Sequence, residues 1–86
     1  MSKAEIIQIL ISVHKKYSNA RVSNETSQMC TLWSTSNPPD ILEGTAPLNE
    51  IEEAINYGFY EEDAIEIYDK EIGDAADYIV KLLEKV

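Results

Sequence analysis

Two glycines, Gly58 and Gly73, each separate two stretches of helical apolar spacing in the second half of the chain. Glycine adopts a positive φ without strain, so it commonly ends a helix and lets the chain turn. The apolar positions around them are Ile51, Ala54, Ile55, then Ala64, Ile65, Ile67, Tyr68, then Tyr78, Ile79, Leu82, Leu83, Val86. Because they recur every three or four residues, the pattern predicts three short helices folded on one another between about residues 48 and 86.

Polar residues near each predicted start indicate the helix boundaries. We expect the first of these helices to run from about residue 47 to Tyr57, with Asn49 as its N-cap, and the second to span residues 61–72. The third should follow Asp74, a residue type suited to cap it.

A further helix is predicted over residues 1–17. The run Ser2-Lys3-Ala4-Glu5 has the form of a capping box, in which each of Ser2 and Glu5 satisfies a backbone N–H of the other. The apolar residues that follow cover more than one stripe: Ile6, Leu10, Val13 and Tyr17, then Ile7 and Ile11, with Ile9 beside them. An arc this wide predicts a helix at the centre of the core, or one that forms half of a homo-oligomer interface.

Residues 18–47 are rich in Ser, Asn and Thr and predict an irregular segment. An apolar cluster within it, Met29, Cys30, Leu32 and Trp33, fits a short helix or a strand that continues to Thr35. The run Asn37-Pro38-Pro39-Asp40 must be extended, because each proline lacks an N–H and restricts the residue before it.

The length of 86 residues allows one small core and no cleft between two lobes. We therefore expect a single, mainly α domain: a small bundle with an N-terminal helix, an irregular middle segment and an acidic three-helix unit over residues 48–86. The sequence begins without the pattern of a secretory signal, and no apolar run approaches the roughly 18 residues of a membrane span. The lone cysteine, Cys30, cannot form an internal disulfide, so we interpret it as a buried, inert thiol. These features predict a cytoplasmic protein without a membrane partner.

The net charge of −9 lies entirely in one half of the chain. Residues 1–47 hold four acidic and four basic residues, whereas residues 48–86 hold twelve acidic and three basic ones. Such a field would repel phosphates, so direct nucleic-acid binding is not expected. It favours a protein partner with a basic or mixed basic and apolar surface, although solubility alone is the simpler explanation.

No set of residues typical of catalysis or cofactor binding is found. One histidine, His14, and one cysteine cannot supply a zinc site, and the carboxylates follow the outer faces of the predicted helices. The sequence also contains no calcium loop and no Gly-rich phosphate loop. We expect no enzymatic activity, no metal and no cofactor, and we interpret His14 as a satisfied or solvent-facing side chain.

One family resemblance covers about the last forty residues. Ile51, Ala54, Tyr57-Gly58-Phe59, Glu62-Asp63-Ala64-Ile65, Gly73-Asp74 and Leu82-Leu83 stand in the order, and near the spacing, that is typical of ubiquitin-associated domains. This part of the chain therefore resembles that compact three-helix module. The resemblance implies a ubiquitin-facing patch at the Tyr57-Gly58-Phe59 loop and at the end of the last helix, near Leu82 and Leu83.

A second resemblance concerns the run from Gly73 to Ile79, which looks like the last helix of acyl carrier proteins. Those proteins carry phosphopantetheine on a serine in an Asp-Ser-Leu context at the start of their second helix. The corresponding residues here read Ile41-Leu42-Glu43-Gly44-Thr45, without that serine. A working carrier is therefore rejected, and a carrier-like or structural subunit stays as an alternative.

The hypothesis that follows is a non-enzymatic, acidic protein-interaction module whose partner is ubiquitin or another protein. Its apolar contact would be Tyr57, Gly58, Phe59, Leu82 and Leu83, and its steering carboxylates would be Glu62, Glu66 and Asp69. An alternative is a small phage or mobile-element inhibitor whose acidic surface imitates nucleic acid and blocks a nuclease or another DNA-binding protein.

Overall fold

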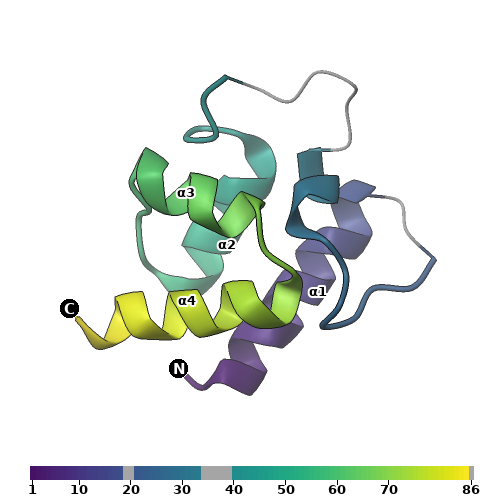
Figure 1. The fold of residues 1–86 in the computed structure, drawn as a ribbon, viewed down its shortest axis with the longest axis horizontal. Coiled ribbons are helices and arrows are strands. Elements are labelled where there is room, and N and C mark those ends of the chain that lie inside the picture. Colours follow the sequence, from purple (N-terminus) through teal and green to yellow (C-terminus); the bar gives the residue numbers. More distant parts are fainter. Residues whose placement is uncertain (19–20, 34–39, 86) are drawn as a thin grey trace.

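The computed structural model describes residues 1–18, 21–33 and 40–85, and within them the chain is mainly helical. The elements are α1 (Lys3–Ser18), a 3-10 helix η1 (Met29–Trp33), α2 (Ala46–Ile55), α3 (Glu61–Tyr68) and α4 (Ile72–Glu84) (Figure 1). The predicted class, a small helical bundle with an irregular middle segment, is confirmed. The extended segment expected at Asn37, Pro38 and Pro39, and the inward position expected for Val86, lie outside the described residues.

Helix α1 is central, as its wide apolar arc predicts. Ser2 and Glu5 form the expected capping box, with the Ser2 N–H donating to the Glu5 carboxylate at 3.1 Å and the Glu5 N–H to the Ser2 hydroxyl at 3.2 Å. From this start, α1 buries Ile6, Leu10 and Val13. Its backbone approaches α4, η1 and α2 more extensively than these elements approach one another (Figure 1). Helices α2 and α4 are therefore covered mainly by α1, whereas α3 packs on α4 and η1.

Helix α2 ends two residues earlier than predicted, and its left-handed residue is an asparagine. Asn56 follows Ile55 with φ 55° and ψ 47°, and the Tyr57 N–H then donates to the Glu52 carbonyl at 3.1 Å. Asparagine tolerates this conformation because its short side chain bonds locally. Gly58 has no positive φ, so the prediction that it is the helix-ending corner is wrong.

Gly73 also differs from its predicted role, because it is the second residue inside α4 rather than a corner before it. Backbone carbonyls from the middle segment cap this helix: the Ile72 N–H donates to Ser27 at 2.9 Å and the Gly73 N–H to Glu25 at 2.8 Å. A Cβ at Gly73 would lie 3.4 Å from the Glu25 carbonyl oxygen, which is ordinary van der Waals contact. The N-cap is Glu71, and Asp74 lies within the first turn instead of capping it.

The same segment ends α3 before residue 72. Gln28 forms an isolated antiparallel bridge with Glu71, and the Met29 N–H donates to the Lys70 carbonyl at 3.0 Å. Residues 70–71 are thereby paired with the middle segment, which explains why α3 ends at Tyr68. The apolar cluster of that segment forms η1, so the helical alternative for Met29–Trp33 is confirmed over the strand.

The start of α2 is also set by a distant residue. Thr45, not Asn49, is the N-cap, and its hydroxyl accepts from the Trp33 indole at 2.9 Å while donating to the Leu42 carbonyl at 2.7 Å. Gly44 precedes it with φ 83°, the one described glycine in the left-handed region. Trp33 thus fixes the entry into α2 from η1.

A buried acid connects α3 to α4. Asp63 is buried, and its carboxylate accepts from the Tyr78 hydroxyl at 2.8 Å and from the Tyr60 N–H at 3.4 Å. The Lys70 ammonium lies 5.6 Å from the centre of the Tyr78 ring. Desolvation, together with the bond to Asp63, raises the pKa of Tyr78 to about 12.

Replacing Gly44 by alanine should lower the free energy of unfolding by about 1 kcal/mol, because a side chain is strained in the left-handed region. A Cβ there would meet no atom within 4 Å, so the loss would report backbone strain alone. Gly58→Ala is the matched control and should be neutral or slightly stabilising, because its Cβ would come no closer than 3.7 Å to Glu52. Urea unfolding measures both; equal losses would contradict this assignment.

Tyr78 should remain protonated well above the pH at which an exposed phenol ionises, because its neutral hydroxyl donates to Asp63. Absorbance at the phenolate band after a jump to alkaline pH should show a component that ionises near pH 12. Tyr78→Phe should remove this component, whereas Tyr60→Phe, a change at an exposed ring, should leave it in place. A titration unchanged by Tyr78→Phe would show that the bond to Asp63 does not persist in solution.

Candidate functional site

The predicted apolar loop is largely part of the core. Phe59 is 4% exposed, its N–H donates to the Glu52 carboxylate at 2.7 Å, and its ring meets the edge of Tyr57 at 5.6 Å between centroids. Tyr57 is half-buried and Gly58 is exposed. The Phe59 ring is therefore largely hidden from a partner, because a chain this short buries the ring to complete its own core.

The two leucines of α4 have a similar role. Leu82 and Leu83 are half-buried and pack against the hydrophobic core. They cover apolar neighbours rather than form a separate exposed patch. The predicted apolar contact is thus divided between a buried ring, an exposed glycine and three half-buried side chains, and it offers no large exposed apolar anchor.

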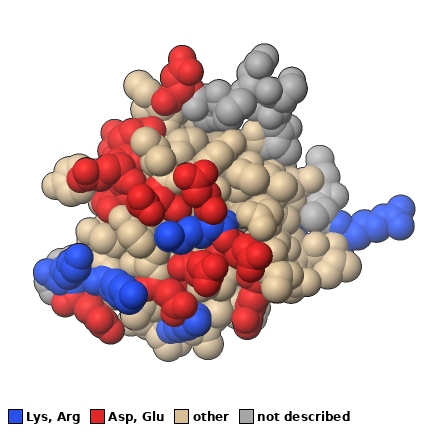
Figure 2. Space-filling model, in the orientation of Figure 1, with Lys and Arg blue, Asp and Glu red and all other residues tan. Residues whose placement is uncertain are grey.

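The predicted steering carboxylates do lie together. Glu62, Glu66 and Asp69 are exposed, and their spacing of four and three residues places them on one side of α3. Acidic side chains gather on the part of the surface where Figure 1 places this helix (Figure 2). Ile65 lies on the same side and is 49% exposed, whereas Ala64 and Ile67 point into the core.

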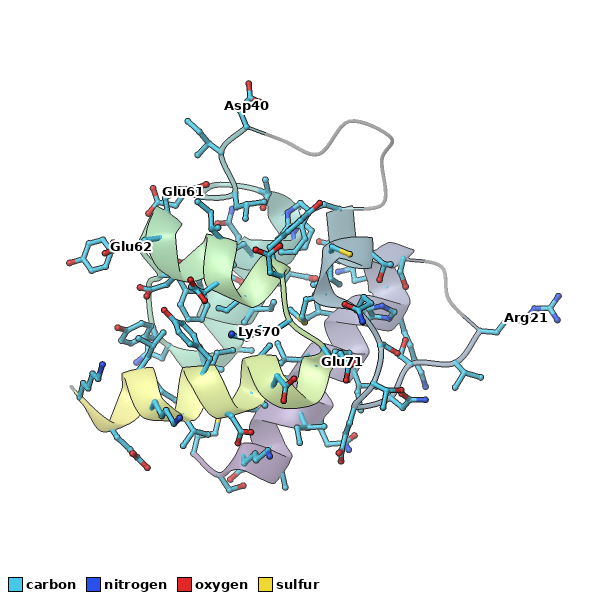
Figure 3. All side chains as sticks on the ribbon, in the orientation of Figure 1. Arg21, Asp40, Glu61, Glu62, Lys70 and Glu71 are labelled. Carbon is cyan, nitrogen blue, oxygen red and sulfur yellow. The ribbon has the colours of Figure 1, made fainter. Side chains whose placement is uncertain are left out.

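The segment before α2 is fastened to the start of α3. The Glu61 carboxylate accepts from the Leu42 N–H at 2.8 Å and from the Glu43 N–H at 2.8 Å. This brings Ile41, which is 62% exposed, near the N-terminal end of α3, where Tyr60 is 70% exposed. Glu61 and Glu62 lie at this end of the helix, and Asp40 lies on the loop above it (Figure 3).

Together these residues form a mixed apolar and acidic surface, which we call the α3 face. Its members are Ile41, Tyr60, Glu62, Ile65, Glu66 and Asp69. Lys70 lies beside this face. Its Nζ is 3.6 Å from a carboxylate oxygen of Glu66 and 5.6 Å from the centre of the Tyr78 ring. Among the described residues, Glu62 and Asp69 have no ion-pair partner. The face therefore carries uncompensated negative charge around exposed apolar groups.

The sequence contained a signal for Ile65 that the prediction did not use. Ile65 follows Glu62 by three residues and precedes Asp69 by four, so it shares the polar stripe of its helix rather than the apolar one. Tyr60 and Ile41 have no comparable signal, because both lie outside helices, and the loop that carries Ile41 is held by Glu61.

His14 is buried at 4% exposure and is bonded at both ring nitrogens. Nδ1 lies 2.6 Å from the Ser23 hydroxyl and Nε2 lies 2.5 Å from the Thr31 hydroxyl. The satisfied alternative for His14 is thus the one observed. Cys30, expected to be buried, is half-buried and free.

Two further observations bear on chemistry. No group of three or more His, Cys, Asp or Glu side chains in the described part of the chain is arranged to hold a metal ion. Its helices also lack the combination of length and apolar character that crossing a bilayer requires.

Comparison with models of protein families, with curated proteins and with solved structures finds no match.

Proposed function

We propose that the chain is a non-enzymatic protein-interaction module, and that its α3 face binds a partner segment carrying both basic and apolar side chains. The observation that carries this proposal is the exposure of Ile65, Tyr60 and Ile41 on the same face as Glu62 and Asp69, which form no ion pair within the described residues. Exposed apolar groups that cluster within a polar rim are typical of interaction surfaces.

The two kinds of group have different roles in such a complex. Burying an isoleucine or tyrosine removes apolar surface from water, and for a fully buried isoleucine side chain this contributes about 1.5–3 kcal/mol. Glu62 and Asp69 would raise the rate of encounter with a basic partner and disfavour acidic ones. Apolar burial would supply affinity, and charge would supply selectivity.

Ubiquitin is the specific partner that the family resemblance suggests. The surface available for it differs from the family expectation, because Phe59 is buried and Leu82 and Leu83 are half-buried. Tyr57 and Gly58 would then be the accessible part of that loop. A titration of the labelled chain with ubiquitin tests this narrower proposal, and shifts confined to residues far from Tyr57 would contradict it.

The inhibitor alternative uses the same carboxylates without the apolar groups. A surface that imitates nucleic acid would depend on charge alone, so its affinity would fall steeply with salt. The α3 face carries apolar side chains between its carboxylates, and this favours the mixed partner over a phosphate-like one.

Two helical peptides of equal positive charge, one built of Lys and Leu and one of Lys and Ser, should differ in affinity. We expect the Lys/Leu peptide to bind about tenfold more tightly, because one buried apolar side chain contributes at least about 1.4 kcal/mol. NMR titration should place the largest shifts at Tyr60, Ile65 and neighbouring amides.

Ile65→Ser should remove most of that difference between the peptides. Val22→Ser is the matched control, because Val22 is 71% exposed but lies in the segment after α1. Equal affinity for both peptides, together with their displacement by a DNA-binding protein, would favour the inhibitor alternative. Shifts spread evenly over the molecule would reject a defined α3 face.

A further inference from the structure

The hydrogen bonds around His14 determine which ring nitrogen carries the proton. The Thr31 hydroxyl donates its proton to the Gln28 carbonyl at 2.7 Å, so at His14 it acts as an acceptor. Nε2 must therefore be the donor, and Nδ1 is left as an acceptor for the Ser23 hydroxyl. The Ser18 hydroxyl, 3.2 Å from Nδ1, donates to the His14 carbonyl instead. Burial disfavours the charged ring, so His14 is assigned as neutral, with its proton on Nε2.

These bonds join α1 to the segment that caps α4. His14 bonds Ser23 and Thr31, which lie on both sides of residues 24–29. Within that stretch, the carbonyls of Glu25 and Ser27 accept from the first N–H groups of α4, and Met29 pairs with Lys70. The α4 cap therefore rests on a segment whose two ends are held by one imidazole.

We propose that His14 is a pH-sensitive latch: its neutral imidazole holds residues 23–31 against α1, and its protonation releases this segment together with the N-terminal cap of α4. The reason is electrostatic. An imidazolium buried without a carboxylate partner would lose its hydration and gain no opposite charge in return.

No charged group around His14 offers that compensation in the described residues. The titratable and charged groups on the elements that surround it are Lys3, Glu5, Lys15, Lys16 and Tyr17 on α1, Arg21 and Glu25 on the segment after α1, Cys30 on η1, and Glu50, Glu52 and Glu53 on α2. Lys16 pairs with Glu50 at 2.5 Å, and Arg21 extends away from the body of the protein (Figure 3). Glu25 is exposed, and Cys30 is half-buried.

The sign of the pH dependence follows from the pKa of His14. Burial lowers this pKa, and a backbone contact with Gln28 opposes the shift only in part. His14 therefore takes up a proton at a higher pH when residues 23–31 are released than when they are held against α1. The latch is therefore at full strength above about pH 6.5, the ordinary value for histidine, and weakens as the pH falls toward the pKa in the fold.

Amide hydrogen exchange of the intact chain between pH 7.5 and 5.5 tests the latch. After correction for the intrinsic rate, the opening constants of the Met29, Ile72 and Gly73 amides should rise by up to about tenfold per pH unit below pH 6.5. Amides inside α2, such as those of Ala54 and Ile55, should change much less. An equal rise at all these amides, or no rise at Ile72 and Gly73, would overturn the proposal.

Two variants separate the charge of His14 from its packing. His14→Gln has no titrating ring, so the opening constants of the latch amides, those of Met29, Ile72 and Gly73, should no longer depend on pH. Thr31→Val keeps the imidazole and removes the acceptor of Nε2, so exchange at the same amides should be faster at every pH while its pH dependence persists. If His14→Gln does not fold, the proposal is still tested by the unmodified chain, in which the opening constants of the latch amides should depend on pH more strongly than those of the α2 amides. Retention of the full pH dependence in a folded His14→Gln would reject the latch.

Discussion

Burial of the apolar arc of α1 is the constraint on which the other elements depend. Ile6 and Leu10 are fully buried and Val13 nearly so, and each is worth about 1.5–3 kcal/mol when removed from water. The arc is too wide for one partner helix, so α4, η1 and α2 each cover part of it. Residues 48–86 are consequently not a self-contained unit, because the apolar sides of α2 and α4 are completed by α1. This is the main departure from a bare three-helix module.

Where the sequence signal is local, the prediction and the structure agree. The capping box at Ser2 and Glu5 needs only residues three apart, and the period of the apolar residues in α1 needs only the helix itself. The ends of α2, α3 and α4 are different. They depend on Trp33 bonding Thr45, and on residues 25–29 bonding Lys70, Ile72 and Gly73. No short-range pattern encodes such contacts, so the predicted caps at Asn49 and Asp74 were wrong.

The candidate site divides along the same line. Glu62, Glu66 and Asp69 could be placed on one exposed side because helical spacing alone fixes it. Phe59 could not be placed, because its position depends on where α2 ends. Once Asn56 takes the left-handed conformation, the chain turns before Gly58 and Phe59 enters the core. A general expectation applies here. A chain of 86 residues has little apolar surface to bury, so its single phenylalanine stabilises the fold more in the core than on the surface.

The acidic residues of α3 differ in what they do for the fold. Glu61 holds the backbone of Leu42 and Glu43, and Asp63 accepts from Tyr78, so both are tied into the structure. Glu62 and Asp69 make no ion pair among the described residues, and Glu62 faces Glu66 one turn away. Like charges at this spacing destabilise a helix by about 0.2–0.5 kcal/mol per pair. A cationic ligand on the α3 face would relieve that repulsion. Binding there would therefore also stabilise α3, whose start is already held by the hydrogen bonds of Glu61 and Asp63.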